Sequence, residues 1–141
     1  MKIQIVYNNE DVLTKDDFAP TRLEALPEIE DASCTAIRLG QVLDFAAERE
    51  TILDTIVSKL RYNGVVFVEG LDLISLGHSI VYGQFTDTEA SELLYNNKRA
   101  SISDMAATTN ILTQRGLHIK TKNLDGSYFF IEAKRLRPDE N

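Results

Sequence analysis

Residues 35–68 read TAIRLGQVLDFAAERETILDTIVSKLRYNGVVFV, and this stretch decides the fold class. Residues 35–39, Thr-Ala-Ile-Arg-Leu, predict a strand, which Gly40 closes. Residues 65–68 are four apolar residues in succession, a pattern typical of a central strand covered on both faces. Between the two strands, apolar side chains recur at helical spacing over residues 46–62. A strand–helix–strand unit joins parallel strands through a right-handed crossover, so the stretch predicts an α/β fold with a mainly parallel sheet.

A turn is predicted at the end of the helix, and few elements are predicted before residue 35. Asn63-Gly64 ends the predicted helix, and we expect Gly64 to adopt the left-handed conformation that is common at helix C-termini. Residues 2–7 alternate polar and apolar before turning apolar, and they predict a strand. Residues 11–33 are acidic, contain two prolines and lack a clear period, so they predict loop with room for one short strand or helix.

The second half of the chain predicts helices and then an antiparallel pair of strands. The first helix is predicted over residues 73–82, and the second runs from the capping box Thr86–Glu89 to about Tyr95. A third helix is capped within Ser101–Asp104 and stops at Gly116. Two strands follow, over residues 117–122 and 127–133, joined by the turn Asp125-Gly126. No repeat or low-complexity linker separates them. We therefore expect one α/β domain over residues 1–135, closed by the antiparallel hairpin, and a flexible tail over residues 136–141.

Composition narrows the classes of partner. The 141 residues, 43% of them hydrophobic, suffice for one domain with a core. A net charge of −7 repels phosphate backbones, so we expect no nucleic-acid partner. No apolar stretch approaches the roughly 20 residues that cross a bilayer, and the first residues do not form a secretory signal, so we expect no membrane partner. Cys34 is the only cysteine, which favours a reducing, cytoplasmic location.

Three segments resemble the class I S-adenosylmethionine-dependent methyltransferases. Residues 26–45, which begin Leu-Pro and contain Val-Leu-Asp-Phe, resemble the family stretch that runs from LPF to V-L-E-H. Residues 60–69 resemble the family's L-K-P-G-G turn and the strand after it. Residues 116–134 resemble its closing antiparallel hairpin. The resemblance implies a reduced, Rossmann-like methyltransferase fold and a family cofactor, S-adenosylmethionine.

The chain departs from the family where the cofactor binds. The family needs a glycine-rich loop after the first strand, because the backbone must approach the cofactor closely, and an acid after the next strand for the ribose hydroxyls. Here the first strand ends in Val6-Tyr7-Asn8-Asn9-Glu10 without a glycine, and the first glycine of the chain is Gly40. If residues 17–22 stand for the next strand, the acid position holds Thr or Arg. The chain is also short by about one strand before residue 26.

Ligands in open α/β sheets bind beyond the carboxyl ends of the strands. The residues predicted at that rim, as cofactor contacts, are Tyr7, Asn8, Gly40, Gln41, Asp44, Glu69 and Asp72. The alternative is a set of solvated loop residues, with Asp44 stabilising the start of the following helix. Glu69, Asp72 and His78 match no metal-binding spacing, so we predict no metal site. Cys34 is expected to be a small buried residue, and no catalytic residue is predicted.

The sequence therefore favours a methyltransferase-like protein that has lost S-adenosylmethionine binding, uses no cofactor and acts as a non-catalytic interaction or assembly subunit. Its partner would be another protein or a second copy of the chain. Tyr82, Phe85 and residues 93–95 form an aromatic and aliphatic group that predicts either a protein contact or plain core packing. One alternative is an active methyltransferase with a divergent or shared cofactor site. Another is a small-ligand binder or lyase that reuses the same crevice.

Overall fold

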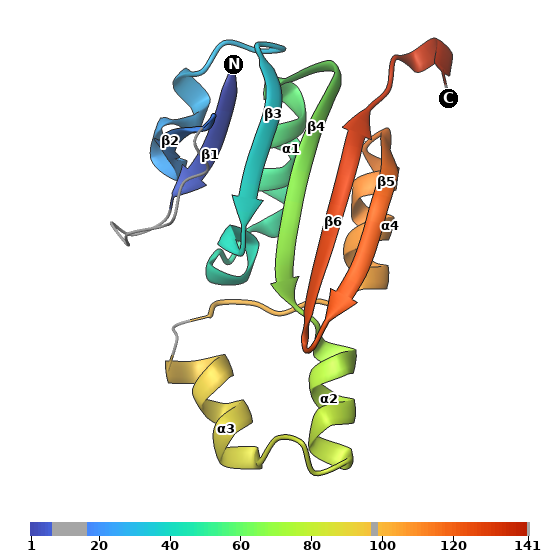
Figure 1. Ribbon diagram of the computed structural model, residues 1–141. Coiled ribbons are helices and arrows are strands. Elements are labelled where there is room, and N and C mark those ends of the chain that lie inside the picture. The colour runs from blue at the N-terminus through green and yellow to red at the C-terminus, as the bar shows by residue number, and fades with distance from the viewer. Residues whose placement is uncertain (7–16, 97–98, 141) are drawn as a thin grey trace.

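The computed structural model describes residues 1–6, 17–96 and 99–140, which form one sheet with helices on one face (Figure 1). The strands are β1 (Lys2–Val6), β2 (Ala19–Arg22), β3 (Cys34–Gly40), β4 (Leu60–Leu71), β5 (Leu117–Asp125) and β6 (Tyr128–Arg135). Their order across the sheet is β2-β1-β3-β4-β6-β5. The first four strands are parallel, and β6 runs antiparallel to both β4 and β5. This order confirms the predicted α/β class with its closing hairpin.

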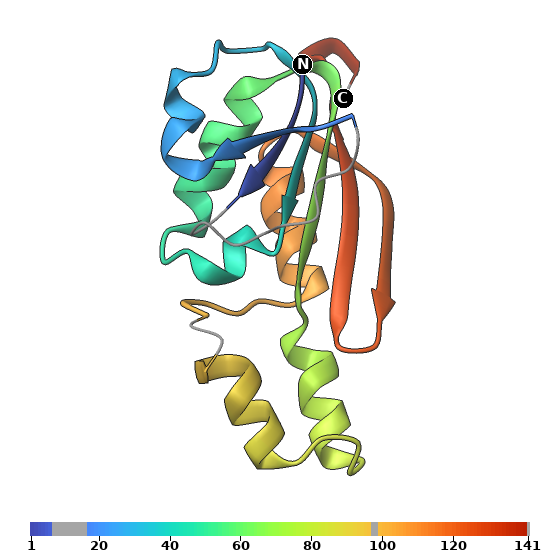
Figure 2. The ribbon, with the colours of Figure 1, turned by 60° about the vertical axis from the view of Figure 1, so that its left-hand side comes forward.

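Two groups of helices accompany the sheet. Helices α1 (Arg49–Lys59) and α4 (Met105–Gln114) pack on the same face of the sheet, as the turned view also shows (Figure 2). Helices α2 (Leu73–Val81) and α3 (Asp87–Ser91) extend beyond the carboxyl end of β4, away from the sheet. Short helical turns complete the chain: η1 (Leu23–Glu28), η2 (Val42–Phe45), the π turn η3 (Glu92–Asn96) and η4 (Pro138–Glu140).

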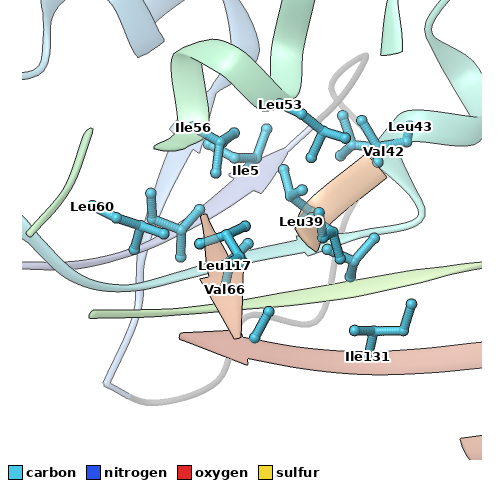
Figure 3. Packing of buried hydrophobic residues seen from close by; sticks show 14 of the residues in the cluster. Ile5, Leu39, Val42, Leu43, Leu53, Ile56, Leu60, Val66, Leu117 and Ile131 are labelled. Carbon is cyan, nitrogen blue, oxygen red and sulfur yellow. The ribbon is translucent and has the colours of Figure 1, made fainter. Parts of the chain in front are cut away.

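The core lies between the sheet and helices α1 and α4 (Figure 3). Alternate residues of β4 and β6, among them Val66 and Ile131, point into it because strand side chains alternate between faces. Leu53 and Ile56 of α1 meet them from the helix side. On the other face of β4, residues such as Phe67 are only half-buried, and no described helix covers this face, so within the described residues the expected cover on both faces is not seen.

Helix α1 ends earlier than the sequence predicts, at Lys59 rather than near residue 63. Leu60 leaves the helix in an extended conformation and is fully buried in the core. The Arg135 guanidinium donates to the carbonyl oxygens of Leu60 and, at 3.0 Å, of Val57, which satisfies carbonyl groups that a helix end leaves free. Burial and a contact from β6 decide this end, and neither is encoded in the local pattern.

Asn63 and Gly64 lie inside β4, where the pairing with β3 is irregular. Asn63, with φ 68°, is the residue that adopts the left-handed conformation predicted for Gly64. A Cβ atom on Gly64 would lie 2.9 Å from the carbonyl oxygens of Arg61 and Cys34. Gly64 therefore permits a close approach between backbones instead of ending a helix.

The segment predicted as mostly loop contains both a short strand and a helical turn. Strand β2 is four residues long and contains Pro20, which a strand tolerates at a sheet edge. It pairs in parallel with β1, with Ile3 opposite Ala19. The turn η1 follows directly and buries Leu26 in the core. Four residues with a proline give too weak a pattern for a strand to be predicted from sequence.

Candidate functional site

The predicted rim residues do not form one cluster. Tyr7 and Asn8 lie outside the described residues. Gly40 ends β3 with φ 55°, Gln41 and Asp44 follow it, Glu69 lies in β4, and Asp72 follows β4. A segment of residues 99–104, which we call the crossing segment, runs across the carboxyl ends of β3 and β4 before α4 begins (Figure 1). Its contacts determine what the rim residues can do.

Asp44 is completely buried, so the alternative of a solvated loop residue was wrong for it. Its Oδ1 accepts a hydrogen bond from Arg49 Nη2 at 2.6 Å. Its Oδ2 accepts from Arg99 Nε at 3.3 Å and from the backbone N–H of Leu71 at 2.9 Å. Hydrogen bonds between a carboxylate and guanidinium groups are stronger than those between neutral groups. The Asp44 carboxylate is thus fully engaged inside the chain.

Arg99, in the crossing segment, is the residue that sequence reasoning missed most clearly. The polar sequence of residues 96–100, Asn-Asn-Lys-Arg-Ala, is typical of an exposed loop, yet the Arg99 side chain is only 4% exposed. Its Nη2 donates to Gln41 Oε1 and its Nη1 to the carbonyl oxygen of Leu93 at 3.2 Å. Its guanidinium also stacks 5.2 Å from the ring centre of Phe45. Arg99 therefore joins the loop after β3 to η3.

The backbone of the crossing segment is attached to the same loop. The N–H groups of Ala100 and Ser101 donate to the carbonyl oxygen of Asp44, at 2.8 and 3.0 Å. The hydroxyl of Ser101 lies 3.0 Å from the carbonyl oxygen of Leu43. The cap expected within Ser101–Asp104 is Asp104, whose carboxylate accepts from the N–H of Ala107. Ser101 instead fixes the crossing segment to η2.

Burial affects the electrostatics of this network. Burial lowers the pKa of Arg49 below its ordinary value, and the charge of Asp44 acts in the opposite direction. The lack of a side chain at Gly70 leaves space for the Asp44 carboxylate. A Cβ atom at this position would lie 3.2 Å from Asp44 Oδ1 and 2.6 Å from the Phe129 ring. Asp44 pairs with both guanidinium groups, and its single negative charge offsets part of the cost of desolvating the two arginines.

Asp72 is also buried and also has a structural role. Its Oδ2 accepts from the N–H of Ser75 at 2.8 Å, which caps α2, and its Oδ1 accepts from the N–H of Met105 at 2.6 Å, in the first turn of α4. Its backbone pairs with Ser103 of the crossing segment. A carboxylate at two helix N-termini is favoured by both helix dipoles. Asp72 therefore fixes the relative positions of α2 and α4.

Glu69 belongs to a different surface. It forms an ion pair with Arg38 at 3.8 Å and lines a groove of about 260 Å³ on the face of the sheet opposite α1 and α4. Phe67 and Phe130 lie in the same groove. The rim prediction thus combined residues from two faces. The structure brings Gln41, Asp44 and Asp72 onto the crossing segment, and places Glu69 apart from them.

The remaining candidates are consistent with structural roles. Cys34 is fully buried, as expected of a small core residue. His78 is exposed and packs edge-on against Tyr82, with ring centres 6.3 Å apart. Within the described part of the chain, His, Cys, Asp and Glu form no group of three that could hold a metal ion. No described helix combines the length and the apolar character that crossing a bilayer requires.

Comparison with known proteins identifies the architecture. No protein-family model matches the sequence, and no curated protein matches it. Solved structures do match. An S-adenosylmethionine-dependent methyltransferase from Archaeoglobus fulgidus superposes with a TM-score of 0.63 over 94% of this chain and 75% of its own, at 12% identity. The chain has a methyltransferase-like fold.

Two further structures support the same fold. A methyltransferase from Thermotoga maritima has a TM-score of 0.60 and 12% identity, over 84% of this chain and 63% of its own. The complex of the Haloferax volcanii Trm112 methyltransferase activator with a methyltransferase gives 0.61 and 11%, over 88% of this chain and 64% of that one. The chain spans less than two thirds of the length of both. Identities this low show the fold alone.

Proposed function

We propose that this chain is a non-catalytic interaction or assembly subunit that keeps the methyltransferase fold and does not bind S-adenosylmethionine. The observation that carries the proposal is the crossing segment, whose Arg99 is buried against Gln41 and Asp44 at the carboxyl end of β3. In open α/β sheets the ligand crevice lies where the strand order reverses, which is between β1 and β3 here. The loop that follows β3 at this point is engaged with the chain itself.

The acids of the described rim support the same proposal. A cofactor ribose requires a carboxylate that can accept hydrogen bonds from its hydroxyls. Asp44 already accepts three hydrogen bonds through its side chain, and Asp72 accepts two. Glu69 is paired with Arg38 on the opposite face of the sheet. Within the described residues, none of these three carboxylates is left for a ribose.

Two further observations favour this proposal over an enzyme. No glycine occurs between the first strand and Gly40, so the sequence lacks the residue type that lets the backbone approach the cofactor. One structural neighbour is a methyltransferase held by the Trm112 activator, which shows that a domain of this fold can carry a protein partner. A protein contact is accordingly the function that we assign to this chain. The absence of nucleic-acid binding remains a prediction from its charge.

Calorimetric titration of S-adenosylmethionine and S-adenosylhomocysteine into the purified protein tests the proposal. We expect no heat of binding and no thermal shift at millimolar ligand. A site with a Kd of about 10 µM would add about 2.7 kcal/mol of stability at about 1 mM ligand. That stabilisation would raise Tm by roughly 8 °C in a domain of this size. The Archaeoglobus fulgidus methyltransferase, measured alongside, serves as the positive control.

Micromolar binding would overturn the proposal. It would favour the alternative of an active methyltransferase with a divergent or shared cofactor site, and the next step would be a search for the methyl acceptor. The variant Arg99→Met adds a second measurement, because it removes one hydrogen bond to Gln41 and one to Asp44. Binding by this variant but not by the natural chain would show that the contacts of Arg99 with the loop after β3 prevent cofactor binding.

A further inference from the structure

Helix α2 exposes an apolar surface that the rest of the described chain does not cover. Its residues Leu73, Ile74, Ile80 and Val81, together with Tyr82 just after it, are 39% to 77% exposed. Leu76 of the same helix is buried against Leu71 and Ala90. A helix that is apolar around most of its circumference is normally buried on more than one side. The solvent side of α2 therefore has the composition of an interface.

The exposed residues form one continuous stripe. At 100° per residue, positions 73, 74, 77, 80 and 81 fall within an arc of about 120°. Gly77 lies at the centre of this arc, and a Cβ atom added there would meet nothing within 4 Å. Glycine is among the least favourable residues in a helix interior. Packing within the chain does not require it, whereas close approach of a second helix does.

The sequence of α2 is nearly symmetric about Gly77. It reads LISLGHSIV, so that Leu73 mirrors Val81, Ile74 mirrors Ile80, and a serine lies two residues to each side of the glycine. A two-fold interface needs the same patch to complement itself, with residue i of one copy against residue j of the other. Two α2 helices that cross antiparallel at Gly77 meet this condition. The helix contains no Asp, Glu, Lys or Arg, so no charge is buried unpaired.

The available area matches a small but specific dimer. Fully exposed side chains of this size present roughly 150–200 Å², so the stripe and Tyr82 offer on the order of 500 Å² per copy. Two copies would bury about 1,000 Å², which is the lower bound expected of a specific interface. Figure 1 shows α2 and α3 standing beyond the end of the sheet, where a second copy can reach the stripe.

We propose that this chain forms a two-fold dimer through α2, with the helices of the two copies crossing antiparallel at Gly77. The inference names the partner of the assembly function proposed above, and to that extent it rests on that function. Three members of the aromatic and aliphatic group predicted from the sequence are packed inside the chain. Phe85, Leu93 and Leu94 contact the buried cluster of Leu71, Leu76 and Ala90. Tyr82 is exposed and belongs to the interface.

Sedimentation equilibrium from micromolar to several hundred micromolar protein tests the dimer. We expect a mass of twice 15.9 kDa at the upper concentrations. Val81→Glu places a charge on the stripe and should weaken the dimer at least 100-fold. Leu124→Glu is the matched control, because it adds the same charge at an exposed leucine on β5 and should leave the dimer intact. Circular dichroism of both variants confirms that each remains folded.

Cross-linking tests the geometry. In a Cys34→Ala chain, Ile74→Cys together with Ile80→Cys keeps Gly77 and places a thiol of one copy opposite a thiol of the other, because residue 74 meets residue 80 across the two-fold axis. Mild oxidation should then give a covalent dimer. Thr88→Cys, at an exposed position on α3, should not cross-link. A chain that stays monomeric at all concentrations overturns the inference, as does a dimer that Val81→Glu leaves unchanged. Binding of the monomer to anionic phospholipid vesicles would assign the stripe to a lipid surface and overturn it as well.

The two proposals fail separately. A dimer that binds S-adenosylmethionine would remove the proposed loss of cofactor binding and leave the α2 interface standing. A monomer that binds no S-adenosylmethionine would remove the interface and leave the loss of cofactor binding standing.

Discussion

Replacing Asp44 with asparagine tests whether the buried network holds the crossing segment. The substitution keeps the size of the side chain and removes its charge. The substitution leaves two arginines without a compensating anion: Arg99, whose side chain is 4% exposed, and Arg49, whose side chain is 13% exposed. It also turns an amide NH₂ group toward N–H donors that the carboxylate accepts from. Removing one partner of a buried ion pair costs about 3–5 kcal/mol. We therefore expect Asp44→Asn to lower the free energy of unfolding by about 3–4 kcal/mol.

Urea denaturation followed by circular dichroism measures this loss, and a thermal melt should show a decrease in Tm of roughly 10 °C. Glu69→Gln is the matched control, because it makes the same chemical change in a half-exposed pair with an N–O distance of 3.8 Å. Its expected cost is at most about 1 kcal/mol. Arg99→Met should cost about 1–2 kcal/mol, since Asp44 retains Arg49 and the N–H of Leu71.

The double variant Asp44→Asn/Arg99→Met completes the cycle. Once Arg99 is gone, only one arginine remains uncompensated, so the double variant should lose about 1–2 kcal/mol less than the sum of the single losses. Strict additivity, or a loss for Asp44→Asn no larger than that for Glu69→Gln, would refute the reasoning. In that case the charged contacts of Asp44 would not be what holds the crossing segment in place.

Three further predictions concern stability, measured by urea unfolding. Gly70→Ala should cost about 2–3 kcal/mol, because the new Cβ lies 2.6 Å from the buried Phe129 ring, and adding Phe129→Leu should recover part of that loss if the clash is its cause. Asp72→Ala should cost about 2 kcal/mol, because it removes acceptors at the N-termini of α2 and α4 together; a loss below about 0.5 kcal/mol would contradict that double role. Ala32→Gly should stabilise the chain by about 0.5 kcal/mol. Ala32 has φ 56°, where a side chain costs about 1–2 kcal/mol, and this strain exceeds the extra conformational entropy, roughly 0.5–1 kcal/mol, that a glycine loses on folding.

The elements that sequence predicts well are those with a local pattern. The strand–helix–strand unit of β3, α1 and β4 follows from apolar periodicity alone. The capping box also forms as expected, with Thr86 Oγ1 accepting from the N–H of Glu89 at 3.1 Å and Glu89 Oε1 accepting from the N–H of Thr86. Gly126 has the positive φ that the predicted hairpin turn requires. Each of these features depends on residues within a few positions of one another.

The candidate site could not be predicted to the same degree, because its contacts are distant in sequence. Arg99 reaches Gln41 across 58 residues and Asp44 across 55. A lone arginine in a polar stretch gives no local sign of burial, and arginine is rarely buried without a partner. The choice of Asp104 rather than Ser101 as the cap of α4 has the same origin, because Ser101 is engaged by the carbonyl groups of η2.

The buried acids and the exposed apolar helix are parts of one arrangement. Asp44 and Asp72 are buried, and the apolar side of α2 is exposed, which reverses what each residue type favours by itself. The acids can be buried because the crossing segment supplies Arg99, and because α4, which follows it, supplies the N–H of Met105.

The same segment connects α3 to α4, and Asp72 caps α2, so these contacts anchor both ends of the α2–α3 hairpin to the rim. The carboxylates predicted at the rim thus hold the α2–α3 hairpin in place, and with it the exposed apolar stripe of α2. It follows that Asp44→Asn, under conditions where the chain is still folded, should weaken self-association measured by sedimentation, whereas Glu69→Gln should not.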